Sequence, residues 1–271
     1  HTPSPGRNVY LLNSRLKIID LDDRANQPFR VRTKTLVYNG ELYNYLELKE
    51  KLAGRGHEFA TASDTEVLLK TIDTFSWEGL DMCEGMWAFA LYDEADGVLT
   101  LCRDRFGEKP LYCYQEDGGL FFGSEVKFIE ALRGRRLDIN FDHLYRYMVN
   151  GYKALYKGED TFFEGLFSVP PATYMRIDAV GNHERHAYWR PRFCPDETMS
   201  YQAAVAEARE RLVRSVELRL RADVPLAFCM SGGVDSNALI SIAKNVLGYD
   251  VHGFTIANSD ERYEEQDMVD C

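Results

Sequence analysis

The sequence predicts two domains of different fold class: a layered α+β domain rich in antiparallel strands, then the first part of an α/β domain with parallel strands. Three observations support this prediction. Short apolar strands separated by turn residues dominate the chain up to about Tyr188. The composition then shifts to Pro, Asp and Glu over residues 190–199. Beyond this shift, a strand, a glycine-containing loop, an amphipathic helix and another strand follow in the order of a β-α-β unit.

The composition is that of a globular chain and excludes several classes of function. The 271 residues are 45% hydrophobic, and the net charge of −11 argues against general attraction to nucleic acid or anionic lipid. The longest apolar stretches, such as 85–92 and 225–230, are too short to span a membrane. Six scattered cysteines without a C-x-x-C pair indicate reduced thiols and a cytoplasmic protein. The chain starts at His1 and stops at Cys271, so we expect a fragment truncated at both ends.

The first predicted domain covers residues 1–195. Two helices are expected, over residues 43–53, ending at Gly54, and over 64–75. The strands that follow are expected at 86–92, 98–103, 111–114 and 120–123. Turn residues at 93–97 and 117–119 join them as antiparallel hairpins.

The second predicted domain covers residues 196–271. A long helix, capped by Thr198 or Ser200, is expected to reach Arg221 with one apolar stripe. The β-α-β unit then consists of a strand at 224–229, a helix at 236–247 and a strand at 251–257. This stretch is too short for a complete doubly wound domain.

The segment Ser231-Gly232-Gly233-Val234-Asp235-Ser236 connects the apolar strand to the amphipathic helix. Glycines allow close approach to a phosphate, and the N–H groups and dipole of a helix start favour negative charge. No Lys-Ser/Thr pair follows, so the segment is not a kinase-type P-loop, and Asp235 would repel phosphate unless Mg²⁺ lay between them. The alternative is a tight strand-to-helix turn in which Asp235 or Ser236 caps the helix.

This segment resembles the pyrophosphate-binding loop of the ATP pyrophosphatases, which cleave ATP between its α- and β-phosphates. The resemblance implies that the loop binds ATP and Mg²⁺, with Asp235 as the metal ligand. It also implies that Cys229 and Ile256, on the two flanking strands, line the adenosine pocket; the alternative for both is a buried strand core. The implied ATP-binding residues are Cys229, Ser231, Gly232, Gly233, Asp235, Ser236 and Ile256.

Motifs of the first domain identify the relatives more closely. They are Arg15–Asp20, Tyr38–Asn44, Ser63–Glu66, Gly85–Ala90 and Arg103–Tyr112. Their order and spacing resemble the class II glutamine amidotransferase domain, an N-terminal-nucleophile hydrolase with an αββα sandwich. With the ATP pyrophosphatase loop, nearly the whole chain is similar to glutamine-hydrolysing asparagine synthetases.

Binding and hydrolysing glutamine requires particular groups. A guanidinium such as Arg15 suits the α-carboxylate, and a carboxylate such as Asp64 suits the α-ammonium. The resemblance assigns the oxyanion hole to the Asn39 side chain and the Gly40 N–H, and a further hydrogen bond to Glu41. Main-chain contacts to glutamine are implied for Leu16, Lys17, Ile18 and Ile19.

Each motif alone has a structural explanation. Asn39-Gly40 is a dipeptide typical of a type I′ hairpin turn, Ser63–Glu66 fits a helix capping box, and Arg15 would suit a surface ion pair. Only the joint order of the motifs favours a glutamine site. The segments 103–112 and 123–127 are interpreted as structural elements whose charges are paired internally, and residues 260–265 as a solvated helix face. Pro170-Pro171-Ala172 replaces the Pro-Gly common in relatives and indicates a different turn.

The family nucleophile is an N-terminal cysteine whose own amino group serves as base. His1 cannot replace it, and Cys83, the earliest cysteine, is expected in a core. Truncation of the sequence explains the missing N-terminal cysteine better than its loss during evolution. β-Lactam synthetases keep the fold without the cysteine and are the alternative, but the persistence of Arg15, Asn39, Gly40 and Asp64 favours a working glutaminase.

The predicted function is a glutamine- and ATP-dependent amide ligase, with aspartate as the leading carboxylate acceptor and AMP and pyrophosphate as products. The alternatives are an ATP-dependent cyclising ligase like β-lactam synthetase, an amidotransferase acting on a sugar or peptide carboxylate, and a non-catalytic binding protein. Glutamine, ATP and Mg²⁺ are the expected ligands, and neither nucleic acid nor membrane is an expected partner. A homodimer is left open.

Overall fold

The computed structural model describes residues 2–4, 7–116, 119–152 and 158–255. The chain forms two compact units, which are described separately below. The first unit comprises His1–Leu16 and Asp22–Arg192, and the second comprises Lys17–Leu21 and Phe193–Cys271.

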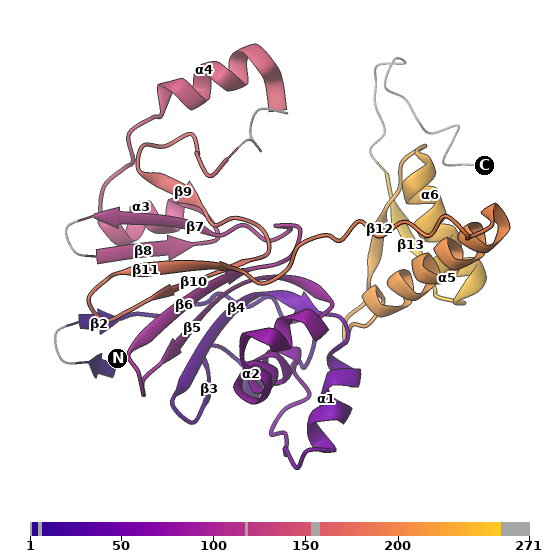
Figure 1. Cartoon of the computed structure of the whole chain (residues 1–271), viewed down its shortest axis with the longest axis horizontal. Coiled ribbons are helices and arrows are strands. Elements are labelled where there is room, and N and C mark those ends of the chain that lie inside the picture. Colours follow the sequence, from indigo (N-terminus) through magenta and orange to yellow (C-terminus); the bar gives the residue numbers. More distant parts are fainter. Residues whose placement is uncertain (1, 5–6, 117–118, 153–157, 256–271) are drawn as a thin grey trace. The chain divides into compact units, whose positions relative to one another are not determined.

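The first unit contains a six-stranded antiparallel sheet in the order β11-β10-β6-β5-β4-β3 (Figure 1). Its strands are β3 (Phe29–Val31), β4 (Lys34–Leu42), β5 (Gly85–Asp93), β6 (Val98–Arg103), β10 (Thr173–Ile177) and β11 (His183–Ala187). The expected hairpin between β5 and β6 is confirmed, and β6 has the predicted bounds.

A second, three-stranded antiparallel sheet has the order β8-β7-β9. It consists of β7 (Tyr112–Glu116), β8 (Gly119–Gly123) and β9 (Leu166–Ser168), and the predicted hairpin of β7 with β8 is confirmed. A separate hairpin pairs β1 (Thr2–Ser4) with β2 (Arg7–Val9).

Hydrophobic clusters show that the first unit has four layers. Helices α1 (Tyr45–Ala53) and α2 (Asp64–Phe75) pack through Leu52 and Leu68 against Leu36 of the six-stranded sheet. Val37 and Cys113 belong to a cluster between the two sheets. Helix α3 (Val126–Arg133) places the fully buried Ile129 against residues of β7 and β8 on the outer side. This αββα arrangement confirms the predicted fold class.

The helices of the first unit were predicted in part. Helix α2 has the predicted bounds, with Val67, Leu68 and Ile72 buried, and α1 ends at Ala53 but begins at Tyr45, two residues later than expected. Helices α3 and α4 (Phe141–Asn150) were not predicted. Short 3-10 helices occur at Asp23–Ala25 and Ser76–Met82.

The second unit begins its regular structure with helix α5 (Tyr201–Arg219), capped by Ser200, whose Oγ accepts a hydrogen bond from Ala203 N. Strand β12 (Ala227–Cys229), helix α6 (Val234–Ser241), a π-helical turn (Ile242–Val246) and strand β13 (His252–Phe254) follow. Strands β12 and β13 are parallel neighbours, so the predicted β-α-β unit is confirmed with shorter strands. Ile256 and residues 260–265 lie outside the described residues.

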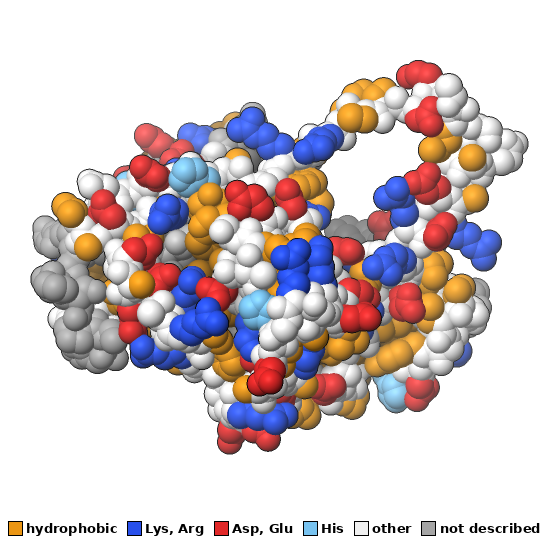
Figure 2. All heavy atoms as spheres, turned by 60° about the horizontal axis from the view of Figure 1, so that its bottom comes forward, with side chains coloured by type: hydrophobic (Ala, Val, Ile, Leu, Met, Phe, Trp, Pro, Cys, Tyr) orange, Lys and Arg blue, Asp and Glu red, His pale blue; other side chains and the backbone are white. Residues whose placement is uncertain are grey.

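The described helices include none that is long and apolar enough to cross a membrane. Figure 2 shows one face of the molecule, on which acidic and basic side chains are interspersed. Within this face, no large area carries charge of a single sign.

Candidate functional site

Asn39 and Gly40 lie inside strand β4, opposite Ala88 and Trp87 of β5. Taken alone, the dipeptide favoured a type I′ turn, and that interpretation is wrong. The close approach of β5 explains the glycine, because a Cβ at position 40 would overlap Met86 O and lie 2.8 Å from Trp87 Cα. The residue pair is therefore a feature of a tightly packed strand.

The Gly40 N–H points toward the open edge of β4. Strand β3 pairs only with residues 34–36, so the rest of that edge has no neighbouring strand among the described residues. Tyr38 N donates to Gln27 Oε1 at 2.6 Å and Leu42 N donates to Asp64 Oδ2 at 3.0 Å, both away from β5. Since backbone groups two residues apart point to the same side of a strand, Gly40 N faces this edge between those two donors.

Side chains of β4 alternate between the two faces of the sheet. Leu36 and Tyr38 belong to the cluster with the helices, whereas Val37 belongs to the cluster between the sheets. By this alternation, Asn39 and Glu41 share the face of Val37. The Asn39 Nδ2 donates to Ser124 Oγ at 3.0 Å.

Asp64 is the first residue of α2 and is only 5% exposed. Besides the bond from Leu42 N, its carboxylate accepts hydrogen bonds from Tyr38 Oη at 3.2 Å and Ser63 Oγ at 3.4 Å. Burial raises the pKa of Asp64, and the hydrogen bonds from Leu42, Tyr38 and neighbouring groups offset this only in part. The fold therefore brings Asp64 to the edge of β4 beside Gly40.

Glu41 adds a second carboxylate to this region. Burial and the nearby charge of Asp64 raise the pKa of Glu41, while Lys109 acts in the opposite direction. Two carboxylates whose charged forms disfavour each other would both be relieved by an added cation. The α-ammonium of an amino acid is such a cation.

Arg15 is connected to the same edge through the segment before β3. Its Nη1 donates to Asp22 O at 3.4 Å and to Asn26 Oδ1 at 3.3 Å. The next residue, Gln27, accepts the hydrogen bond from Tyr38 N. Through Asn26 and Gln27, Arg15 is thus connected to the edge of β4 by one short segment.

The remaining residues expected to contact glutamine are divided between the two units. Leu16 is 82% exposed and ends the first segment of unit one. Lys17, Ile18 and Ile19 belong to the second unit, where Ile18 O accepts a hydrogen bond from Asp223 N at 2.9 Å. In the same unit, Asp20 N donates to Asp223 Oδ2 at 2.7 Å.

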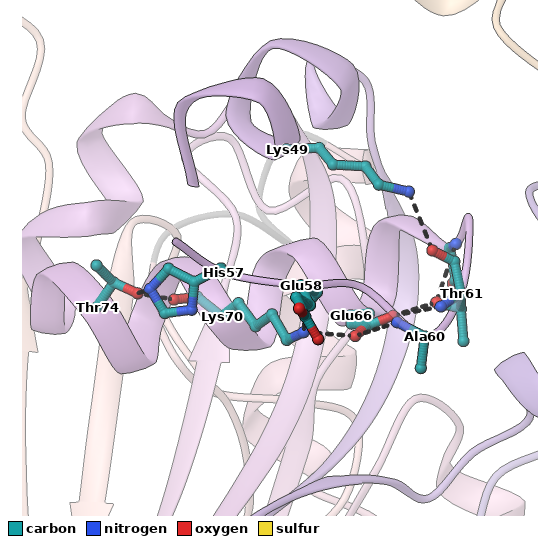
Figure 3. Close-up of polar contacts among 9 residues, drawn as sticks. Lys49, His57, Glu58, Ala60, Thr61, Glu66, Lys70 and Thr74 are labelled. Carbon is teal, nitrogen blue, oxygen red and sulfur yellow. Dashed lines mark hydrogen bonds and ion pairs between the residues drawn. The ribbon is translucent and has the colours of Figure 1, made fainter. Parts of the chain in front are cut away.

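A cluster of polar contacts around Glu66 holds the segment before Asp64 (Figure 3). The capping-box pattern of Ser63–Glu66 predicted this arrangement only in part. Ser63 is the N-cap of α2, as the capping box predicts, and its Oγ accepts from Thr65 N at 3.2 Å. The Glu66 side chain does not accept the hydrogen bond from Ser63 N that a capping box requires. Instead its carboxylate accepts from Ala60 N at 3.0 Å, Thr61 N at 2.7 Å and Thr61 Oγ1 at 2.6 Å.

Lysines complete this cluster. Lys70 Nζ lies 2.7 Å from Glu66 Oε1 and donates to Glu58 O, and Lys49 Nζ donates to Thr61 O at 3.0 Å. Burial acts to raise the pKa of Glu66, but the hydrogen bonds from Lys70 and Thr61 outweigh it, so the pKa is lowered. The ionised carboxylate therefore fixes the loop that leads into Ser63 and Asp64.

A second buried carboxylate organises the loop after β6. Asp104 is fully buried and accepts hydrogen bonds from four backbone N–H groups, those of Trp87, Phe106, Glu108 and Lys109. Arg103 donates to the carbonyls of Gly107, Lys109 and Val169. An internal pairing of charges was expected here, but the structure instead shows Asp104 and Arg103 hydrogen-bonded mainly to backbone groups.

The loop 231–236 of the second unit is partly exposed, and the hydroxyl groups of its two serines form hydrogen bonds within the loop. Ser231 Oγ and Ser236 Oγ lie 2.8 Å apart, and Gly233 N donates to Ser231 Oγ at 3.3 Å. The N-cap of α6 is Gly233, and the helix begins at Val234, so the expectation that Asp235 or Ser236 caps it is wrong. Gly233, Val234 and Asp235 are exposed rather than packed against other side chains.

The loop offers a single carboxylate as a ligand for a metal ion. In the part of the chain that the structure describes, no group of three or more His, Cys, Asp or Glu side chains could hold a metal. Asp235 offers one exposed carboxylate, so Mg²⁺ there would need phosphate oxygens as further ligands. Cys229, expected either in the adenosine pocket or in a strand core, is exposed on β12, and the core alternative is wrong for this residue.

The cysteines of the first unit pack in its interior. Cys83, Cys102 and Cys113 are buried and free. Burial raises the pKa of Cys83 to about 12, which suppresses its thiolate. The expectation that Cys83 is a core residue is confirmed.

Comparison with known proteins matches residues 5–189 to the family described as "Glutamine amidotransferase domain". The chain belongs to this family. Residues 207–270 match the family described as "Asparagine synthase". The chain therefore combines an amidotransferase domain with the beginning of an asparagine synthase domain.

The curated relatives of this chain include asparagine synthetases and an amidase. The chain is 33% identical to "Asparagine synthetase [glutamine-hydrolyzing] 1" of Bacillus subtilis, over 89% of this chain and 39% of that protein. It is 30% identical to "Putative asparagine synthetase [glutamine-hydrolyzing] 2" of Methanocaldococcus jannaschii, over 97% of this chain and 53% of that protein. It is 31% identical to "Amidase chry2" of Gibberella zeae, over 90% of this chain and 36% of that protein. The chain thus spans about half or less of the length of these relatives.

Proposed function

We propose that this chain is the glutaminase domain and the first part of the synthetase domain of a glutamine- and ATP-dependent amide ligase, with aspartate as acceptor and asparagine as product. The observation that carries the proposal is the direction of the Gly40 N–H, which faces the open edge of β4 between Gln27 and Asp64. A backbone donor at that edge, next to a buried carboxylate, suits a substrate that carries both an ammonium and a carbonyl.

In this proposal each residue has one task in glutamine binding. Arg15 pairs with the α-carboxylate, while Asp64 and Glu41 attract the α-ammonium. The carboxylate of Asp64 already accepts several hydrogen bonds, and the longest, from Ser63 Oγ at 3.4 Å, is the one most easily exchanged for an ammonium donor. The Asn39 Nδ2 and the Gly40 N donate to the oxygen that becomes negative when a nucleophile adds to the side-chain amide. When that adduct collapses, the C–N bond breaks, and the amide nitrogen takes up the proton of the nucleophile and leaves as ammonia.

The second part of the chain would hold ATP. The exposed N–H groups at the start of α6 face the phosphates, and Ser231 and Ser236 supply hydroxyl groups there. Asp235 is the residue placed to ligate Mg²⁺, which offsets phosphate charge when bound. An acceptor carboxylate oxygen attacks the α-phosphorus, and pyrophosphate leaves. Ammonia then attacks the acyl carbon, loses a proton and expels AMP.

The amidase name of one relative supports a second candidate, an amidotransferase with another carboxylate acceptor, such as one on a sugar or a peptide. A cyclising ligase of the β-lactam synthetase type would use ATP and release AMP without hydrolysing glutamine. We also propose a cytoplasmic location, in keeping with the free cysteines of the described residues.

The test is an assay of the full-length protein with glutamine, ATP and Mg²⁺, and with aspartate and a panel of other carboxylic acids. We expect release of glutamate, AMP and pyrophosphate, and of asparagine when aspartate is the acid. AMP release with another acid alone would select the second candidate. AMP release without glutamate would favour the cyclising ligase, and release of neither product would overturn the proposal.

A further inference from the structure

The carboxamide of Asn39 is held from the opposite sheet. Asn39 lies in β4 of the six-stranded sheet, and Ser124 follows β8 of the three-stranded sheet. The Asn39 Nδ2 donates to Ser124 Oγ at 3.0 Å, so this hydrogen bond crosses between the two sheets. Within the described residues, it is the one side-chain hydrogen bond of this amide.

Ser124 has a fixed position because it lies at a strand-to-helix junction. The preceding residue, Gly123, pairs with Tyr112 in the sheet. The following residue, Glu125, is the N-cap of α3, and its carbonyl accepts from Phe128 N at 3.1 Å. The fully buried Ile129 anchors α3 to the same sheet. The hydroxyl of Ser124 is therefore held by elements with little freedom to move.

A primary amide has two N–H donors and one carbonyl acceptor on the same planar group. We propose that Ser124 is a positioning residue for glutamine hydrolysis. By accepting one Nδ2 hydrogen of Asn39, it directs the other Nδ2 hydrogen toward the oxygen that becomes negative in the reaction. This inference rests on the proposed glutaminase function of Asn39.

The physical reason for such a residue is the two-fold rotation of a carboxamide. Turned by half a rotation, Asn39 would present its Oδ1 instead of its Nδ2, and a carbonyl oxygen would repel the developing oxyanion. A donor fixed beforehand needs no reorganisation at the moment of reaction, which is the basis of oxyanion stabilisation. A serine hydroxyl can donate or accept, so the orientation of the amide is given by the placement of Nδ2, rather than Oδ1, beside Ser124 Oγ. Ser124 holds the amide in that position without contact to glutamine.

The test measures glutamate release by the full-length protein. We expect Ser124→Ala to lower kcat by about 10- to 100-fold while the KM for glutamine stays within about twofold, because only the transition state needs the aligned donor. Asn39→Ala should lower kcat by about 100- to 1,000-fold. Ser124→Thr keeps a hydroxyl and should recover most of the rate. The double variant should be no slower than Asn39→Ala alone, since both changes remove one function.

Ser168→Ala is the matched control. Ser168 lies in β9 of the same sheet, and its hydroxyl accepts from Arg103 Nη1 at 2.9 Å. Its removal costs one half-buried hydrogen bond without touching Asn39, so kcat should not change. A bond between Asn39 and Ser124 with only a structural role would lower the melting temperature of Ser124→Ala and leave kcat unchanged, as in the control.

A second measurement reads the Asn39 amide directly and does not depend on activity. In protein labelled with ¹⁵N-asparagine, the Asn39 side-chain signals are assigned by their loss in Asn39→Ala. We expect these two proton signals to shift and exchange faster with water in Ser124→Ala, and to stay in place in Ser168→Ala and close to wild type in Ser124→Thr. If Ser124→Ala does not fold, the threonine variant and the wild-type signals still report the bond.

The outcomes separate this inference from the function on which it rests. A full-length protein without glutaminase activity overturns the proposed function and the role of Ser124 with it. An active wild type whose Ser124→Ala variant keeps its kcat overturns the role of Ser124 alone. The role of Ser124 is also overturned if the Asn39 signals do not change in Ser124→Ala. The same holds if the double variant is slower than Asn39→Ala by the full factor lost in Ser124→Ala.

Discussion

The two regions assigned to substrates differ in how their residues are held. Around β4, Asp64 is 5% exposed and accepts hydrogen bonds from Tyr38 and Leu42 of β4 and from the adjacent Ser63. In the loop 231–236, Asp235 is exposed and the side-chain hydrogen bonds of Ser231 and Ser236 stay within the loop. The fold preorganises the first region. The second region is a short backbone turn, and in the proposed function its further partners are phosphate oxygens. Changes in the first should therefore cost stability, and changes in the second should cost activity alone.

The largest effect is expected at Gly40. In Gly40→Ala the new Cβ would overlap Met86 O and approach Trp87 Cα to 2.8 Å, which forces β4 and β5 apart. We expect a loss of about 3 kcal/mol in the free energy of unfolding. Urea unfolding followed by tryptophan fluorescence measures it, because all three tryptophans, at 77, 87 and 189, lie in the first unit.

Gly54→Ala is the matched control for that change. Gly54 has helical backbone angles at the end of α1, and its added Cβ would meet atoms only at 3.6 Å and beyond. We expect a change within about 0.5 kcal/mol. Equal losses in the two variants would show that β4 is no more tightly packed than a helix end.

The Glu66 cluster should give the next largest effect on the free energy of unfolding. Glu66→Gln leaves Lys70, whose side chain is 13% exposed, without its ionic partner, and we expect a loss of about 2 kcal/mol. Glu207→Gln is the control with the same spacing, because Glu207 and Arg211 form an exposed pair four residues apart on α5. It should change helix stability, followed by circular dichroism, by about 0.5 kcal/mol or less. A similar loss in both variants would show that the buried pair of Glu66 and Lys70 stabilises the fold no more than the exposed pair on α5.

The same cluster predicts a pH dependence. The pKa of Glu66 is lowered in the folded chain, because its hydrogen bonds from Lys70 and Thr61 outweigh the effect of burial. Its ionised form therefore stabilises the fold above the usual value of 4.5, and this contribution is lost as the pH falls through the lower folded pKa. Urea unfolding between about pH 3 and pH 5 should show a smaller pH slope in Glu66→Gln than in the wild type. Parallel slopes would contradict the lowered pKa.

Asp235 tests the second region, where the expected loss is in activity. In the full-length protein, Asp235→Asn should reduce AMP release by roughly 100-fold, equivalent to about 2.7 kcal/mol, because one ligand charge for Mg²⁺ is removed. The free energy of unfolding should change by about 0.5 kcal/mol or less, since the side chain is exposed. Asp250→Asn removes the same charge from another exposed position and should leave AMP release unchanged. A clear destabilisation by Asp235→Asn would mean that the loop is structural.

Local sequence patterns predicted elements well where apolar periodicity was strong. Helix α2 and strand β6 have the expected bounds because their buried faces follow helical and strand periods. The dipeptide Asn39-Gly40 was misleading alone because its conformation is set by β5, which a local pattern does not include. Helix α4 was not predicted, although Phe141, Tyr145 and Met148 recur along it at helical spacing.

The candidate site was predictable only in its composition. Asn39, Glu41 and Asp64 come together as residue types that suit glutamine, but their supporting residues have no sequence signal. Glu66 looked like half of a capping box, and its true partners depend on how residues 58–62 fold over the helix. The contact of Ser124 with Asn39 joins two sheets and depends on tertiary structure alone.

The smallest expected effect is at Ala172, in the turn where Pro-Gly was anticipated from relatives. Ala172 has φ of 53°, a left-handed conformation that costs a residue with a Cβ about 1 kcal/mol. It persists because Ala172 N donates to Asp104 O at 2.8 Å and Ala172 O accepts from Tyr188 N at 2.9 Å. Ala172→Gly should therefore raise the free energy of unfolding by about 0.5 to 1 kcal/mol. Ala131→Gly, in the exposed part of α3, should lower the free energy of unfolding by a similar amount. Opposite signs in the two alanine variants would show that the turn before β10 holds Ala172 in a strained conformation.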